Sequence, residues 1–191
     1  MKLNPHDEAL INNLKDGSYG ALMPIEPDQL PDREAYCAIV CGDGVRRKET
    51  TSHLRSITGC NCDHTIALPG GASLLAPESP LSDEATRKVL LEKGVAQARK
   101  LQGTKTVLVT AHLPCGAAYD AGITGVQLID HIVSAKHQIR LFAAQHNISD
   151  ITPVGLLDVE FSDGKKRTYV IKREGWEAWK QENATRQIAA E

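Results

Sequence analysis

The chain alternates between apolar runs and amphipathic stretches, a pattern that predicts strands separated by helices. Continuous apolar runs at 35–41, 65–68 and 106–110 each stop at a short turn, which is typical of buried strands. Helical spacing of apolar residues predicts helices over 83–101 and 126–145, the first capped by Ser82 or Asp83 and stopped by Gly103.

The C-terminal part of the chain has a different pattern. A strand over 151–161, a turn at 162–164 and a returning strand over 166–172 predict a hairpin, and a polar helix follows over 174–190. Strands alternating with helices indicate an α/β fold, in which a mostly parallel sheet is flanked by helices. In such a sheet the ligand site lies at the carboxyl ends of the strands.

The first 34 residues are expected to stand apart from this fold. An apolar patch over 9–14 predicts a helix, and three prolines between 24 and 31 predict an irregular arm that packs on the body or on a second subunit. The rest of the chain, 35–191, is interpreted as a single α/β domain.

Composition restricts the function further. The chain has 191 residues with 24 acidic and 22 basic side chains, so its net charge of -2 and its two short basic runs argue against a nucleic-acid partner. No apolar stretch approaches the ~18 residues that span a bilayer, and the N-terminus lacks the apolar core of a secretory signal. We therefore expect a cytoplasmic protein without a membrane partner.

Five cysteines in a reducing compartment favour metal binding or nucleophilic chemistry over disulfides. Cys41 closes the first predicted strand, while His112 and Cys115 follow the third, and a parallel sheet would bring all three to one edge. Two thiolates and one imidazole suit Zn²⁺, with a fourth position left for water. An equally good interpretation is that these residues bind no metal: the cysteines are small buried residues, and His112 is a loop histidine with an ordinary hydrogen-bond partner.

The motifs that follow the three strands are a Cys-x-Asp segment, a glycine-rich turn and a His-x-x-Cys-Gly segment: Cys41 to Asp43, Gly70 with Gly71, and His112 to Gly116. In this order they resemble the β-class carbonic anhydrases, over about residues 35–161. The resemblance implies a homodimer or higher oligomer and a zinc ion held by Cys41, His112 and Cys115. It also implies that zinc-bound hydroxide interconverts CO₂ and bicarbonate.

The family's catalytic pair is only partly matched. Asp43 stands at the position of the aspartate that accepts a hydrogen bond from the zinc-bound water, but Val45 replaces the arginine that pairs with it, and Gly44 replaces a serine. We expect Gly44 to let the turn lengthen so that Arg46 pairs with Asp43. The alternative is that Arg46 lies on a solvated face and Asp43 itself coordinates the zinc.

Substrate contacts and the remaining cysteines leave further alternatives. Bicarbonate is expected to contact the backbone at Gly70, Gly71 and Gly116, although the turn differs from the family's usual Arg-Asn-Ala-Gly-Asn. The same chemistry could act on carbonyl sulfide or carbon disulfide, or the zinc could be bound without turnover. Cys60, Cys62 and His64 are interpreted as partly buried strand residues, with a separate metal or redox site as the minor alternative.

Overall fold

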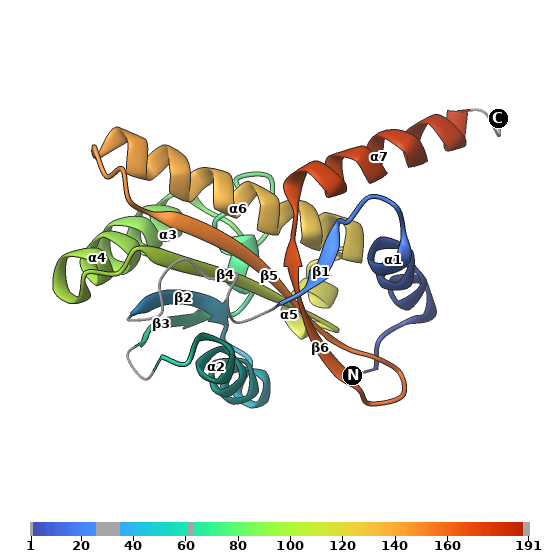
Figure 1. Cartoon of the computed structure of the whole chain (residues 1–191), viewed down its shortest axis with the longest axis horizontal. Helices are drawn as coiled ribbons and strands as arrows, with labels where there is room; N and C mark the ends of the chain where they lie inside the picture. Colours follow the sequence, from blue (N-terminus) through green and yellow to red (C-terminus); the bar gives the residue numbers. More distant parts are fainter. Residues whose placement is uncertain (1, 26–34, 61–62, 189–191) are drawn as a thin grey trace.

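The computed structural model of the chain describes residues 2–25, 35–60 and 63–188 and shows one twisted sheet with helices on both faces (Figure 1). Its strand order is β1-β6-β5-β4-β2-β3. The strands are β1 (Leu22–Pro24), β2 (Tyr36–Cys41), β3 (Asp63–Leu68), β4 (Thr106–Leu113), β5 (Thr152–Glu160) and β6 (Lys166–Ile171). Strands β3, β2, β4 and β5 pair in parallel with one another, in that order. Strand β6 pairs antiparallel with β5 on one side and with β1 on the other. The mostly parallel sheet and the C-terminal hairpin are thus confirmed.

The helices divide into two layers around the sheet. Several helices cover one face of the sheet and enclose the larger apolar core, whereas a single polar helix covers the other face and a smaller core (Figure 1). The first layer contains α1 (Pro5–Asp16), α3 (Glu84–Val89), α4 (Ala96–Gln102) and α6 (Gly125–Gln145), and the second contains α2 (Gly44–Thr58). The short α5 (Gly116–Asp120) follows β4, and α7 (Arg173–Ile188) ends the described chain.

The third predicted strand is longer than its apolar run suggested. β4 continues to Leu113 because β5 pairs with it in parallel as far as Leu113 opposite Val159. Every residue of β4 is buried, and so is every residue of β2. His112 therefore lies inside a strand rather than after it, which corrects the sequence-based assignment.

The helix predicted over 83–101 is present as three helical segments that follow one another without a break: α3, a middle segment and α4. Asp83 caps its start through the amide of Thr86, and Gly103 ends it in a left-handed conformation, as predicted. Its middle, Leu90–Val95, is a π-helical segment. A Cβ atom at Gly94 would overlap the end of the Ile66 side chain in β3, so a larger residue there would require that side chain to move.

Helix α2 was not predicted, because its sequence is mostly polar. Among its described side chains only Thr50, Leu54, Ile57 and Thr58 are buried, and two of these four are polar, so its apolar stripe is short. Such a helix is stabilised mainly by tertiary packing, here on β2. Within the described residues, no helix is long and apolar enough to cross a membrane. The predicted irregular arm is wrong at Pro24, which belongs to strand β1 and pairs with Tyr169 of β6, and the rest of the arm, 26–34, lies outside the described residues.

Candidate metal centre

Cys41, His112 and Cys115 come together at the carboxyl edge of the parallel strands. Cys41 is the last residue of β2, His112 lies next to the end of β4, and Cys115 immediately precedes α5. The three side chains are only 4–5% exposed, and one ligand atom from each lies within 4.8 Å of the others. Of the described residues that carry metal-binding side chains, this is the group whose geometry could hold an ion.

The separation of the two sulfur atoms tests whether zinc fits. Cys41 Sγ and Cys115 Sγ are 4.0 Å apart. Two Zn–S bonds of about 2.3 Å at a tetrahedral angle place their sulfurs about 3.8 Å apart, so the pair needs almost no adjustment. With the imidazole of His112 as a third ligand, these side chains could bind a metal of the tetrahedral, thiolate-preferring type.

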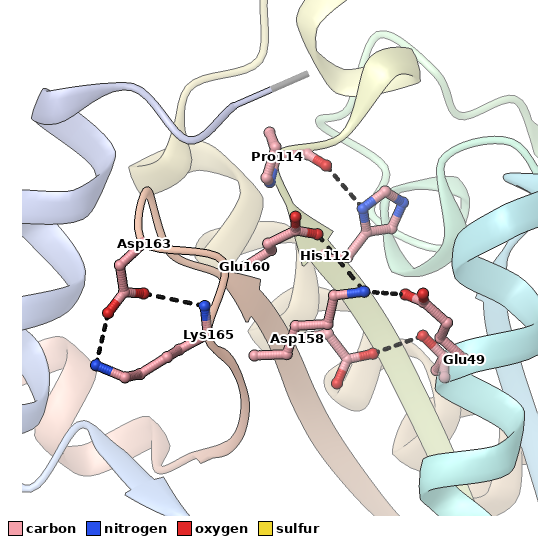
Figure 2. Close-up of polar contacts among 9 residues, drawn as sticks. Glu49, His112, Pro114, Asp158, Glu160, Asp163 and Lys165 are labelled. Carbon is pink, nitrogen blue, oxygen red and sulfur yellow. Dashed lines mark hydrogen bonds and ion pairs between the residues drawn. The ribbon is translucent and has the colours of Figure 1, made fainter.

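The imidazole of His112 is oriented by the backbone. Its Nδ1 lies 2.9 Å from the carbonyl oxygen of Pro114, as Figure 2 shows. A carbonyl only accepts hydrogen bonds, so Nδ1 carries the proton and the lone pair of the neutral ring is on Nε2. This is the arrangement that metal-binding histidines usually have, with the second ring nitrogen fixed by an acceptor.

The two thiols share a hydrogen bond and titrate as a pair. The hydrogen bond from Cys115 lowers the pKa of Cys41, and contacts with His112 and with the amides of Asp43 and Gly70 lower it further, against the effect of burial. The same bond and burial raise the pKa of Cys115. One negative charge is therefore stabilised on the sulfur pair, which favours a bound cation.

Backbone amides also point at Cys115. The amides of Ala118 and Ala117, in α5, hydrogen-bond to its sulfur and lower its pKa, although less than burial and Cys41 raise it. Both sulfurs thus accept N–H groups in addition to their mutual bond. Sequence reasoning missed these contacts, because every residue carries an amide and no side-chain pattern marks the ones that turn toward a ligand.

The predicted glycine-rich turn is wedged between the strands that carry the ligands. Gly71 has a φ of 52°, in the left-handed region. A Cβ atom there would lie 2.6 Å from the carbonyl oxygen of Thr110 and 2.9 Å from the amide nitrogen of Cys41. Only glycine fits both the conformation and the space, so the turn can contact β2 and β4 directly.

The remaining predicted site residues lie around this centre. Asp43 is exposed, and its carbonyl accepts the Arg47 amide at 2.7 Å, so helix α2 begins directly beside the cluster. Arg46 is in the first turn of α2, but its side chain lies outside the described part of the structure, so its pairing with Asp43 stays a prediction. Gly116 starts α5, and a Cβ atom there would meet no neighbour within 4 Å.

The second cysteine cluster is not on one strand. Cys60 precedes β3 and is 3% exposed within the small apolar core under α2. His64 lies in β3 and is paired in register with Cys37 of β2. Cys62 lies outside the described residues, so a redox role for Cys60 and Cys62 stays untested.

A polar network borders the metal centre on the side of α2. Asp158, the register partner of His112 in β5, accepts hydrogen bonds from Thr50 and Thr168 at 2.8 and 2.6 Å. Lys166 forms an ion pair with Glu49 at 2.6 Å, and Figure 2 shows Glu49 and Asp158 in the same region as His112. The network ties α2 to the hairpin and so supports the helix whose first turn lies at the site.

No protein-family model and no curated protein matches the sequence. Among solved structures, the wild-type β-carbonic anhydrase CafD of the filamentous fungus Aspergillus fumigatus matches with a TM-score of 0.52 and 13% identity, over 79% of this chain and 99% of that one. Two single-residue mutants of the same enzyme match with TM-scores of 0.52 and 0.50, also at 13% identity. The sheet order, the flanking helices and this likeness show that the chain has a β-carbonic-anhydrase-like fold.

Proposed function

We propose that the chain is a zinc-dependent carbonic anhydrase-like lyase that interconverts CO₂ and bicarbonate. The observation that carries the proposal is the buried group of Cys41, His112 and Cys115, at the carboxyl edge of a sheet with a β-carbonic-anhydrase-like fold. Parallel sheets bind their ligands at this edge, and the donor set is one that zinc uses in catalytic sites.

Zinc bound there would supply a Lewis acid that lowers the pKa of water toward neutrality. Two thiolates offset the charge of the ion more than neutral imidazoles do. We therefore expect CO₂ hydration to increase toward alkaline pH.

The chain's own residues divide the remaining work. The Asp43 carboxylate accepts a hydrogen bond from the O–H group of the attacking nucleophile and so aims an oxygen lone pair of that nucleophile at the carbon of CO₂. Arg46 pairs with Asp43 and keeps it away from the metal. Backbone amides at Gly71 and Gly116 stabilise the negative charge that develops on the product, whereas the Gly70 amide already donates to the Cys41 sulfur.

Metal analysis combined with stopped-flow CO₂ hydration across pH tests this function. We expect one zinc per chain and a rate above the uncatalysed reaction that increases with pH. Parallel assays with carbonyl sulfide and carbon disulfide identify the substrate. Full zinc occupancy without turnover of any of the three would contradict the enzymatic proposal.

A zinc-binding protein without turnover is the second candidate, and Val45 favours it. With valine at the position of the family's arginine, Asp43 could take the fourth zinc position and close the site. In that case Asp43→Asn should weaken zinc binding. In the enzyme, the same change should abolish hydration and leave zinc in place.

We also propose a homodimer or a multiple of one. Closed two-fold symmetry is the commonest arrangement among soluble homo-oligomers, and the resemblance to the carbonic anhydrases implies it. Analytical ultracentrifugation should give at least twice the monomer mass. A stable monomer at micromolar concentration would contradict the assignment.

A further inference from the structure

A buried hydrogen bond joins the long helix α6 to the segment behind the metal centre. His131 in α6 is 4% exposed, and its Nδ1 lies 3.1 Å from Oγ of Ser73, which is fully buried. Burying polar groups in an apolar core costs free energy unless they are hydrogen-bonded to each other. The two side chains therefore hold each other in one arrangement.

Ser73 is directly linked to the turn at the metal centre. It belongs to the short 3₁₀ helix Gly71–Leu74, all of which is buried, and its amide donates to the carbonyl of Gly70 at 3.0 Å. The amide of Gly70 in turn hydrogen-bonds to the Cys41 sulfur. Three consecutive contacts thus run from His131 to a predicted zinc ligand.

The turn has little freedom to move independently. Gly71 is packed against Thr110 and Cys41 so closely that even a methyl group would not fit. A shift of Ser73 is therefore transmitted to the backbone that contacts Cys41, because close-packed groups move together.

Helix α6 is a rigid support for this contact. Its N-terminus has a complete capping box between Thr124 and Gln127, and Ile129, Ile132 and Ile139 are 0% exposed. Burial lowers the pKa of His131, against the opposing effects of Glu78 and Asp130, so the imidazole is neutral near neutral pH. A neutral ring can keep the bond to the Ser73 hydroxyl.

We infer that His131 is a positioning residue for the metal centre: through Ser73 it holds the Gly70–Gly71 turn against Cys41. The inference rests on the proposed metal-binding function. It assigns to α6 a role in metal affinity that is separate from its role in the apolar core.

A comparison of two buried residues of α6 tests the inference. Lys136 is 9% exposed and donates to the carbonyl of Ile171, at the end of β6 and away from the turn. We expect His131→Leu to weaken zinc binding about tenfold, in line with the loss of other groups that orient metal ligands. Lys136→Met should lower the thermal midpoint and leave zinc affinity within twofold. Competition with a chromophoric chelator measures the affinity, and thermal melting of the metal-free proteins measures stability.

A conservative variant and a double variant distinguish a positioning role of His131 from a general loss of packing. In His131→Asn, the amide can occupy the place of Nδ1, so zinc affinity should recover at least in part. Ser73→Ala should weaken zinc binding as His131→Leu does, and the double variant should lose no more than either single one. Ser73→Ala also tests the inference if His131→Leu does not fold. The cobalt(II)-loaded variants should show altered d–d bands, and the Lys136→Met protein should not.

Unchanged zinc affinity in Ser73→Ala or His131→Leu would overturn the inference, and so would an equal loss in Lys136→Met. A wild-type chain that binds no zinc would instead overturn the proposed function. The two failures are therefore distinguishable.

Discussion

Two glycine turns at the same edge of the sheet differ in what surrounds them. Gly71, behind the metal centre, and Gly164, in the β5–β6 hairpin, both have positive φ angles, of 52° and 81°. A Cβ atom at Gly71 would collide with two strands, whereas one at Gly164 would meet no neighbour within 4 Å. Both glycines allow a turn, but only Gly71 also allows a close approach between backbones. The candidate metal ligand Cys41 lies beside Gly71.

Charged groups also differ between the β5–β6 hairpin and the metal centre. At the hairpin, Lys165 and Asp163 form an ion pair of 2.7 Å with both side chains more than half exposed. At the metal centre, the sulfur pair is buried and backbone amides stabilise its charge. Charge at the hairpin is screened by water, whereas charge at the centre depends on fixed donors.

Removal of a predicted ligand should have the largest effect. In Cys115→Ser the centre keeps two good ligands, so zinc affinity should fall by more than the ~100-fold that loss of an orienting partner costs. Stability in the presence of zinc should fall as well, because metal-binding free energy is also folding free energy. Cys60→Ser, outside the centre, is the control. Full zinc occupancy in Cys115→Ser, measured by elemental analysis, would show that the ligands are assigned wrongly.

Alanine substitutions of the two glycines test the comparison directly. Gly71→Ala combines a left-handed backbone with overlap against Thr110 and Cys41, and should cost about 3 kcal/mol, or a decrease of about 10 °C in the thermal midpoint. Gly164→Ala meets only the backbone preference and should cost about 1 kcal/mol. Equal decreases in the two melting curves would mean that the crowding at Gly71 is relieved without cost.

Arginine variants of α2 address catalysis rather than structure. Under the proposed function, Arg46→Ala should lose at least about tenfold in CO₂ hydration while keeping its zinc, since Asp43 would lose the cation that positions it. Arg47→Ala, the neighbouring exposed cation, should change the rate little. Equal and unimpaired hydration rates in the two proteins would exclude a role for Arg46.

The smallest effect is expected at the hairpin. Lys165→Ala removes one partner of an ion pair whose two side chains are mostly exposed, and exposed pairs contribute little to stability. The thermal midpoint and zinc affinity should both stay at the wild-type values. A clear loss of zinc affinity in Lys165→Ala would show that the hairpin and the metal centre are coupled.

Predictions from the sequence succeeded where one physical effect dominates. The runs at β2 and β4 are apolar because both faces of those strands are buried, so the strands were readable from composition alone. The grouping of Cys41, His112 and Cys115 followed from strand order and from the rule that parallel strands end at a common edge. Neither step required knowledge of a side-chain contact.

The features that were missed depend on tertiary contacts. Helix α2 has few buried apolar residues, and its packing on β2 stabilises it more than any local pattern could indicate. The bond between His131 and Ser73 was also missed, because the two residues lie 58 positions apart and no spacing rule connects them. The extension of β4 through His112 likewise depended on pairing with β5.

Helix α7 brings the two ends of the chain together. Trp179 donates to Asn13 of α1 across 166 positions at 2.6 Å, and Tyr19 bonds with Glu182 across 163. Contacts between such distant segments form slowly, because the intervening chain loses entropy when the loop closes. On the ribosome, α1 emerges before α7 but completes its docking only after α7 has been synthesised. Helix α1 therefore cannot form its full set of contacts until α7 is available.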